Sequence, residues 1–134
     1  GIKAIKPGAT LYDLGKAIQS YAEGEGFSVV RDFCGHGVGR VFHDAPNIVH
    51  YAEYRDRLTG VHRAADTPLK PGMFFTVEPM INEGRPDVKL LKDGWTAVSR
   101  DKSLSAQFEH SVGVTENGVE IFTLSPKGWT KPPY

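Results

Sequence analysis

Two histidines and two glutamates are the candidates for a chemical role in this sequence. His36 and His43 stand in a glycine-rich segment, residues 34–46, and Glu78 and Glu109 follow downstream. Imidazole and carboxylate groups bind hard or borderline divalent cations, and paired cations need carboxylates to bridge them. One histidine and two glutamates from neighbouring strands would make half of such a site. The sequence therefore predicts a hydrolytic metal centre that is incomplete.

The glycine-rich segment must be loop or strand, because Gly35, Gly37 and Gly39 alternate through it. Glycine costs about 1 kcal/mol in a helix interior. We expect these glycines to let the backbone turn tightly and approach a ligand, with His36 and His43 projecting from loop or strand ends.

The elements that must position these residues are one helix followed by strands. Thr10 and Asp13 form a capping-box start, and Gly24 and Gly26 end the helix. Its apolar face is predicted to hold Leu11, Leu14, Ala17, Ile18 and Tyr21. Strands are predicted over residues 27–33, 47–51, 73–81, 95–99, 107–115 and 119–124, the last two joined as a hairpin. The fold class is α+β, with mostly antiparallel strands.

Strand alternation places each glutamate on a defined face. Glu78 shares a face with Phe74 and Thr76, opposite Phe75 and Val77, and is followed by a proline that cannot donate to a ladder. In the later strand the polar face holds Gln107, Glu109, Ser111 and Gly113, opposite Phe108, His110, Val112 and Val114.

Taken singly, each residue has a plainer interpretation. A glutamate on a strand is most often solvated on an open sheet face. His36 alone could be a hydrogen-bonded turn histidine, and His43 could cap a loop through Asp44. Phe42 and Trp95 are either ordinary core residues or walls of a pocket.

The other histidines and the single cysteine are expected to be structural. His110 lies on an apolar face, which favours a core histidine, while His50 and His62 are isolated and predicted to be surface or structural residues. Cys34 is expected to be a small buried residue, since no adjacent base would activate it.

Composition narrows the class of protein. The 134 residues carry 16 basic and 16 acidic side chains with no block of like charge, so neither nucleic acid nor a membrane surface is expected as a partner. One cysteine excludes an internal disulfide framework and agrees with a reducing compartment, so we expect a cytoplasmic protein.

Four segments closely resemble type I methionine aminopeptidases, which have the pita-bread metallopeptidase fold. They are residues 35–46 (GHGVGRVFHDAP), 70–80 (KPGMFFTVEPM), 93–95 (DGW) and 103–110 (SLSAQFEH), in the family's order. The resemblance implies a curved, mostly antiparallel sheet with flanking helices. It also implies removal of initiator methionine from nascent peptides whose second residue is small.

The resemblance implies a role for each site residue. His36, Glu78 and Glu109 are the metal ligands, with Glu109 bridging two divalent ions of the Co, Mn, Fe or Zn class. Glu78 also relays a proton of the attacking water, His43 hydrogen-bonds the substrate, and Phe42 and Trp95 wall the methionine pocket.

The chain also departs from the family. The family site has five protein ligands, and its two aspartates and a further substrate-facing histidine come from an N-terminal half that residues 1–134 do not match. We therefore expect the C-terminal portion of one catalytic domain, inactive by itself, with an apolar face for the other half. The alternatives are a non-catalytic pita-bread binding module and an aminopeptidase P or prolidase-type peptidase.

Overall fold

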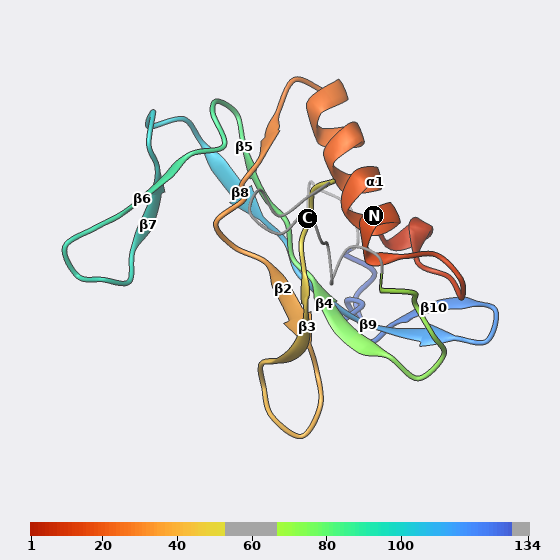
Figure 1. Ribbon diagram of the computed structural model, residues 1–134. Helices are drawn as coiled ribbons and strands as arrows, with labels where there is room; N and C mark the ends of the chain where they lie inside the picture. Colours follow the sequence, from red (N-terminus) through yellow and green to blue (C-terminus); the bar gives the residue numbers. More distant parts are fainter. Residues whose placement is uncertain (53–66, 130–134) are drawn as a thin grey trace, which may run out of the picture.

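The computed structural model describes residues 1–52 and 67–129, which form one α-helix, a 3-10 turn and ten short strands (Figure 1). All pairs of neighbouring strands are antiparallel, as predicted for this α+β chain. The helical elements are η1 (Ile2–Ala4) and α1 (Leu11–Gly24). The strands are β1 (Ser28–Val29), β2 (Gly35–Gly37), β3 (Asp44–Ile48), β4 (Phe74–Val77), β5 (Met80–Asn82), β6 (Val88–Leu90), β7 (Ala97–Ser99), β8 (Ser105–Gln107), β9 (His110–Thr115) and β10 (Gly118–Ile121).

Helix α1 begins at the predicted capping box. The Thr10 hydroxyl accepts a hydrogen bond from the Asp13 amide at 3.2 Å, and the Asp13 carboxylate accepts one from the Thr10 amide at 2.8 Å. The buried face differs from the prediction at its last turn, where Tyr21 is 74% exposed and Ala22 is buried. Ala22 follows Ile18 by four residues, so it continues the buried stripe and allows the helix to pack closely.

Two sheets adjoin at a break in the strand pairing, and this break positions the site. A five-stranded sheet has the order β10-β9-β4-β2-β3, and a three-stranded sheet has the order β1-β5-β8. Val77 pairs with His110 in the first sheet, and Met80 pairs with Gln107 in the second. The two residues between β4 and β5 therefore lie opposite the two residues between β8 and β9.

The sequence predicted two uninterrupted strands, 73–81 and 107–115. This prediction is wrong at the break, because β4 and β5 replace the first and β8 and β9 replace the second. Pro79 follows Glu78 and has no N–H for a ladder, which gives a physical reason for the interruption.

Other strand predictions need smaller corrections. The strand predicted over 27–33 is confined to β1, and the one predicted over 47–51 lies earlier, as β3. The strand predicted over 95–99 is the short β7, which pairs with the unpredicted β6, and the one predicted over 119–124 is β10. The hairpin between β9 and β10 is confirmed, with Gly118 paired to Thr115.

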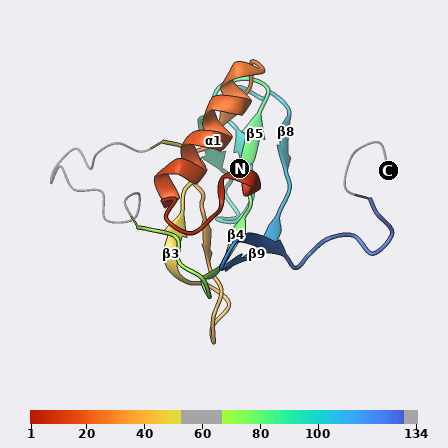
Figure 2. The same ribbon diagram turned by 90° about the vertical axis from the view of Figure 1, so that its right-hand side faces the viewer.

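The core lies between α1 and one face of the strands (Figure 2). It joins Leu11, Leu14 and Ile18 of the helix to Phe75 and Val112 of the sheet. Strand β4 lies between β2 and β9, so the end of β4 and the start of β9 lie side by side at the break. Among residues 1–52 and 67–129, no helix has the length and apolar character needed to cross a membrane.

Candidate metal centre

His36 is held close to the neighbouring strand because glycine stands on both sides of it in β2. A Cβ added to Gly35 would lie 2.5 Å from the Thr76 carbonyl oxygen, and one added to Gly37 would clash with the Ala45 carbonyl. The His36 amide donates to Thr76 Oγ1 at 3.0 Å. Strand β2 can therefore approach β4 and β3 only with glycine on both sides of the histidine.

The ring of His36 is oriented for ligation through Nε2. Its Nδ1 lies 2.9 Å from the Gly37 carbonyl oxygen, which can only accept, so Nδ1 carries the proton in this hydrogen bond. Nε2 of the neutral ring is then left with its lone pair, 3.8 Å from Glu78 Oε1. A donor bond from the second ring nitrogen is the usual way in which a ligating histidine is fixed.

Glu78 lies at the break between β4 and β5 and is held from two directions. Thr76 Oγ1 donates to its Oε1 at 2.7 Å, and its backbone amide donates to His50 Nε2 at 3.1 Å. The Glu78 side chain is 18% exposed and that of His36 is 13% exposed. The carboxylate is therefore held in place yet accessible from solvent.

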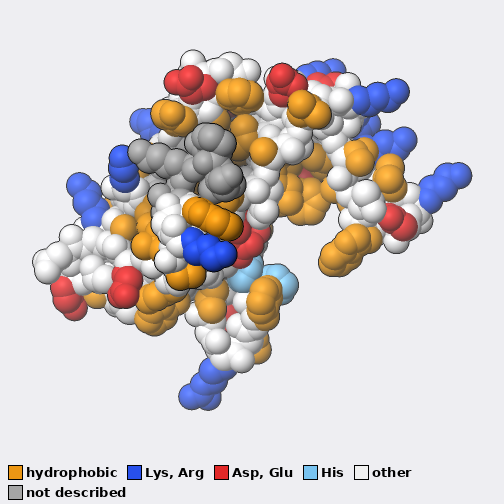
Figure 3. Space-filling model, turned by 180° about the vertical axis from the view of Figure 1, so that it is seen from behind, with side chains coloured by type: hydrophobic (Ala, Val, Ile, Leu, Met, Phe, Trp, Pro, Cys, Tyr) orange, Lys and Arg blue, Asp and Glu red, His pale blue; other side chains and the backbone are white. Residues whose placement is uncertain are grey.

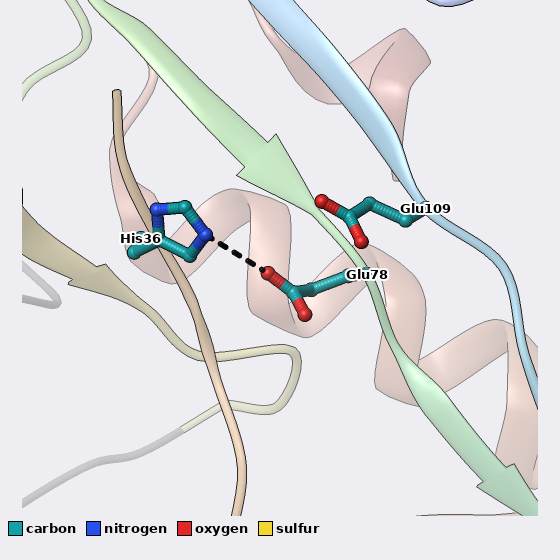
Figure 4. A group of neighbouring side chains, drawn as sticks. All are labelled: His36, Glu78 and Glu109. Carbon is teal, nitrogen blue, oxygen red and sulfur yellow. Dashed lines mark ion pairs between the residues drawn. The ribbon is translucent and has the colours of Figure 1, made fainter. Parts of the chain in front are cut away.

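Glu109 completes the cluster from the other side of the break (Figure 4). It lies between β8 and β9, and one ligand atom from each of His36, Glu78 and Glu109 lies within 4.8 Å of the others. Two ligands at about 2.1 Å from a common ion are at most about 4.2 Å apart, and the 3.8 Å between His36 and Glu78 satisfies this limit. One imidazole and two carboxylates are a donor set suited to divalent cations, so the residues fit a metal.

Two neighbouring groups are kept uncharged by their surroundings. Burial lowers the pKa of His50 to about 4. Burial, and then the nearby Glu78 carboxylate, raises the pKa of the Cys34 thiol. The half-buried Cys34 thus remains a protonated thiol, which argues against a nucleophilic role.

The predicted substrate residues lie in two different places. The His43 ring packs 4.4 Å from the His36 ring and 4.7 Å from the Phe42 ring, between centroids. His43 and Glu78 help to line a depression of about 510 Å³ beside His36. Figure 3 shows imidazole and carboxylate side chains at the surface together, beside the notch that separates the body from a projecting arm.

Trp95 lies in that arm, between β6 and β7, and is 88% exposed. Its backbone is fixed by Asp93, whose Oδ1 accepts from the Trp95 and Thr96 amides at 3.0 and 2.9 Å. Neither Trp95 nor Phe42, which is 76% exposed, is among the residues that line the depression. Because both side chains are largely exposed, the interpretation of Phe42 and Trp95 as ordinary core residues is wrong. Their role as pocket walls stays a prediction.

The remaining described histidines, His110 and His50, differ in burial. His110 is only half-buried, with Nδ1 2.9 Å from Thr123 Oγ1, so the prediction of a core histidine is wrong. Its position next to the break leaves it at the rim of the core. His50 is 2% exposed and structural. His62 lies outside the described residues.

Sequence reasoning missed two residues that hold the site, Thr76 and His50. Thr76 carried a signal, because alternation puts it on the same strand face as Glu78. The sequence contained no signal that links His50 to Glu78, because the two residues are 28 positions apart along the chain.

Comparison with known proteins agrees with this geometry. Residues 1–116 match the profile described as Metallopeptidase family M24. The chain belongs to metallopeptidase family M24. Divalent metal chemistry is the property that gives this family its name, and the M24 chain brings together a partial set of His and Glu ligands.

The M24 chain is similar to methionine aminopeptidases. It is 60% identical over 135 residues to the methionine aminopeptidase of Rickettsia prowazekii, covering 100% of this chain and 49% of that protein. The crystal structure of the Rickettsia prowazekii enzyme matches with a TM-score of 0.79 over 92% of this chain and 46% of that chain. The pita-bread fold predicted from the sequence is thereby confirmed.

A prolidase from Pyrococcus furiosus is also similar, at 28% identity and a TM-score of 0.55, over 92% of this chain and 28% of that chain. The M24 chain spans about half the length of the curated relatives it matches.

Proposed function

We propose that this chain supplies the C-terminal half of a methionine aminopeptidase catalytic domain. The complete domain would remove the N-terminal initiator methionine from nascent peptides with the help of two divalent metal ions. The observation that carries this proposal is that His36 in β2, Glu78 just after β4 and Glu109 just before β9 each place a ligand atom within 4.8 Å of the others. The 60% identity to a methionine aminopeptidase supports this substrate over the Xaa-Pro substrates of the more distant relatives.

The proposed ligands are His36 through Nε2, Glu78 and Glu109, with Glu109 as the carboxylate that bridges two ions. Bound divalent cations would supply Lewis acidity and lower the pKa of water toward neutrality. Glu78 is suited to carry a proton, because its carboxylate is solvent-accessible and is held by the Thr76 hydroxyl at 2.7 Å.

The proposed substrate contacts lie beside these ligands. His43 faces the same depression as His36 and Glu78, where its ring nitrogens could hydrogen-bond a peptide near the scissile bond. Phe42 and Trp95 are the proposed walls of the methionine pocket, and their exposure is consistent with a surface that another part of the domain encloses.

Three ligands are too few for a tightly held pair of ions, so we propose that the chain by itself is inactive. The proposed partner is the N-terminal half of the domain, which would supply two aspartates and a further histidine. An apolar surface formed by Phe27, Ile81 and Leu104 is suited to contact with it, since Phe27 is 44% and Leu104 is 76% exposed.

The test is reconstitution. The chain is mixed with the N-terminal half of the Rickettsia prowazekii relative in the presence of Mn²⁺ or Co²⁺, and cleavage of Met-Ala-Ser is compared with that of an Xaa-Pro peptide. We expect Met-Ala-Ser cleavage by the mixture and none by the chain alone. Glu109→Gln should abolish the activity, while the exposed turn variant Glu116→Gln should retain it.

Other results would contradict specific parts of the proposal. Cleavage of Met-Ala-Ser by the isolated chain with equimolar bound metal would refute the proposed inactivity. A mixture that binds no metal and cleaves neither peptide would favour a non-catalytic binding module. Preference for the Xaa-Pro peptide would favour an aminopeptidase P or prolidase-type enzyme.

A further inference from the structure

His50 connects the end of one strand to the break that carries Glu78. It follows β3 after one residue, Val49, and only 2% of it is exposed. Its Nε2 lies 3.1 Å from the backbone nitrogen of Glu78. A buried imidazole from a distant part of the sequence therefore contacts the backbone of a proposed metal ligand.

The Glu78 amide needs such a partner because it lies outside the strand ladders. Strand β4 ends at Val77, strand β5 begins at Met80, and Pro79 between them has no N–H. A buried backbone N–H without an acceptor costs about 1 to 3 kcal/mol. The break that exposes the Glu78 carboxylate would leave this donor unpaired if His50 did not accept it.

The direction of this hydrogen bond fixes the form of the His50 ring. A backbone N–H can only donate, so Nε2 must present its lone pair and the proton of the ring must be on Nδ1. No other protein side chain has an acceptor nitrogen on a rigid ring of this length.

We propose that His50 is a positioning residue, which holds the Glu78 backbone at the break so that the carboxylate meets His36 and Glu109. This inference rests on the proposed function of Glu78 as metal ligand and proton carrier. Thr76 fixes the carboxylate at one end of the residue, and His50 fixes the amide at the other. Together they leave Glu78 little freedom to turn away from the cluster.

The test compares His50→Leu, which removes the acceptor, with His50→Gln, whose side-chain oxygen can accept at a similar reach. Leu14→Ala is the matched control, because it destabilises the core from α1 without touching Glu78. Two quantities are measured in the full chain: hydrogen exchange of the Glu78 amide by NMR, and affinity for Mn²⁺ by calorimetry.

We expect His50→Leu to raise the exchange rate of the Glu78 amide at least about tenfold and to weaken Mn²⁺ binding by about 10- to 100-fold. His50→Gln should retain both properties within about threefold, as should Leu14→Ala for the affinity. The inference is overturned if His50→Leu matches the unsubstituted chain, or if Leu14→Ala causes the same loss of affinity. If His50 had only a structural role, His50→Leu and Leu14→Ala would both lower stability and would have the same effect on Mn²⁺ affinity.

Two further measurements apply if metal binding or folding fails. If the unsubstituted chain binds no Mn²⁺ even when mixed with the N-terminal half of the Rickettsia prowazekii relative, the proposed function of this chain fails, while the exchange of the Glu78 amide in His50→Gln and His50→Leu still decides whether His50 holds it. If His50→Leu does not fold, the ¹⁵N shifts of the His50 ring in the unsubstituted protein decide instead. An unprotonated Nε2 supports the inference, and a protonated Nε2 overturns it.

Discussion

Replacing Thr76 by valine is expected to weaken the proposed metal centre and the fold together. Thr76 is 2% exposed, and its hydroxyl has two short hydrogen bonds besides a longer contact of 3.5 Å with the His36 carbonyl oxygen. It donates to Glu78 Oε1 at 2.7 Å and accepts from the His36 amide at 3.0 Å. Valine has nearly the same shape, so the substitution removes both hydrogen bonds while opening little space.

The expected loss of stability follows from these two contacts. The His36 amide would lose its acceptor at a half-buried position, at a cost of about 1 to 3 kcal/mol. The bond to the Glu78 carboxylate contributes toward the lower end of about 1.5 to 3 kcal/mol, because water reaches this side chain and replaces part of it. The additional buried methyl group offsets about 0.8 kcal/mol. A net loss of about 2 to 3 kcal/mol in the free energy of unfolding is therefore expected.

Thr76→Ser is the matched control, since it keeps the hydroxyl and loses one methyl group, at about 1 kcal/mol. Urea unfolding of the metal-free chain measures stability, and calorimetry measures Mn²⁺ affinity, which should fall by about 10- to 100-fold in Thr76→Val alone. Equal stabilities and equal affinities for the valine and serine variants would refute the assigned role of the hydroxyl.

Three further predictions concern the helix and the approach of β2. Thr10→Ala should destabilise the protein by about 1 kcal/mol in thermal unfolding, whereas Thr10→Ser should cost only a few tenths. Hydrogen bonds from the Thr10 amide and hydroxyl lower the pKa of Asp13 below its ordinary 3.8, so this carboxylate stabilises the fold above that pH. The stabilisation should be lost as the pH falls through the lower folded pKa, and an NMR titration of Asp13 in Thr10→Ala should show its pKa returning toward 3.8. Gly35→Ala should separate β2 from the Thr76 carbonyl and lower Mn²⁺ affinity at least about tenfold, while Gly118→Ala, which has open space around it, should leave the affinity unchanged.

The geometry of the sheet explains how residues far apart in sequence become neighbours in the proposed metal site. Glu78 and Glu109 each lie at the point where a strand is interrupted, and the pairing of Val77 with His110 places these points opposite each other. A residue in an uninterrupted strand would have its amide and carbonyl committed to the ladder. At the break, the backbone can turn so that both carboxylates face the ring of His36 (Figure 4).

Local patterns in the sequence were sufficient for the helix and the hairpin, and the residue types were sufficient to propose ligands. The capping box of Thr10 and Asp13 and the hairpin before Gly118 depend on neighbours a few residues away, so both were predictable. Imidazole and carboxylate chemistry likewise belongs to the side chains themselves. Tyr21 was misplaced because its exposure depends on which turn of the helix meets the core.

The tertiary structure alone decided how the site is assembled. The break in the sheet depends on the register between β4 and β9. This register relates two distant segments, and neither segment shows it in its own pattern of apolar and polar residues. The roles of Thr76 and His50 depend on that break, because only there does the Glu78 amide need a side-chain acceptor. The sequence by itself determined which groups could bind a metal. The pairing of strands determined that His36, Glu78 and Glu109 meet, since their convergence is a property of long-range backbone hydrogen bonds.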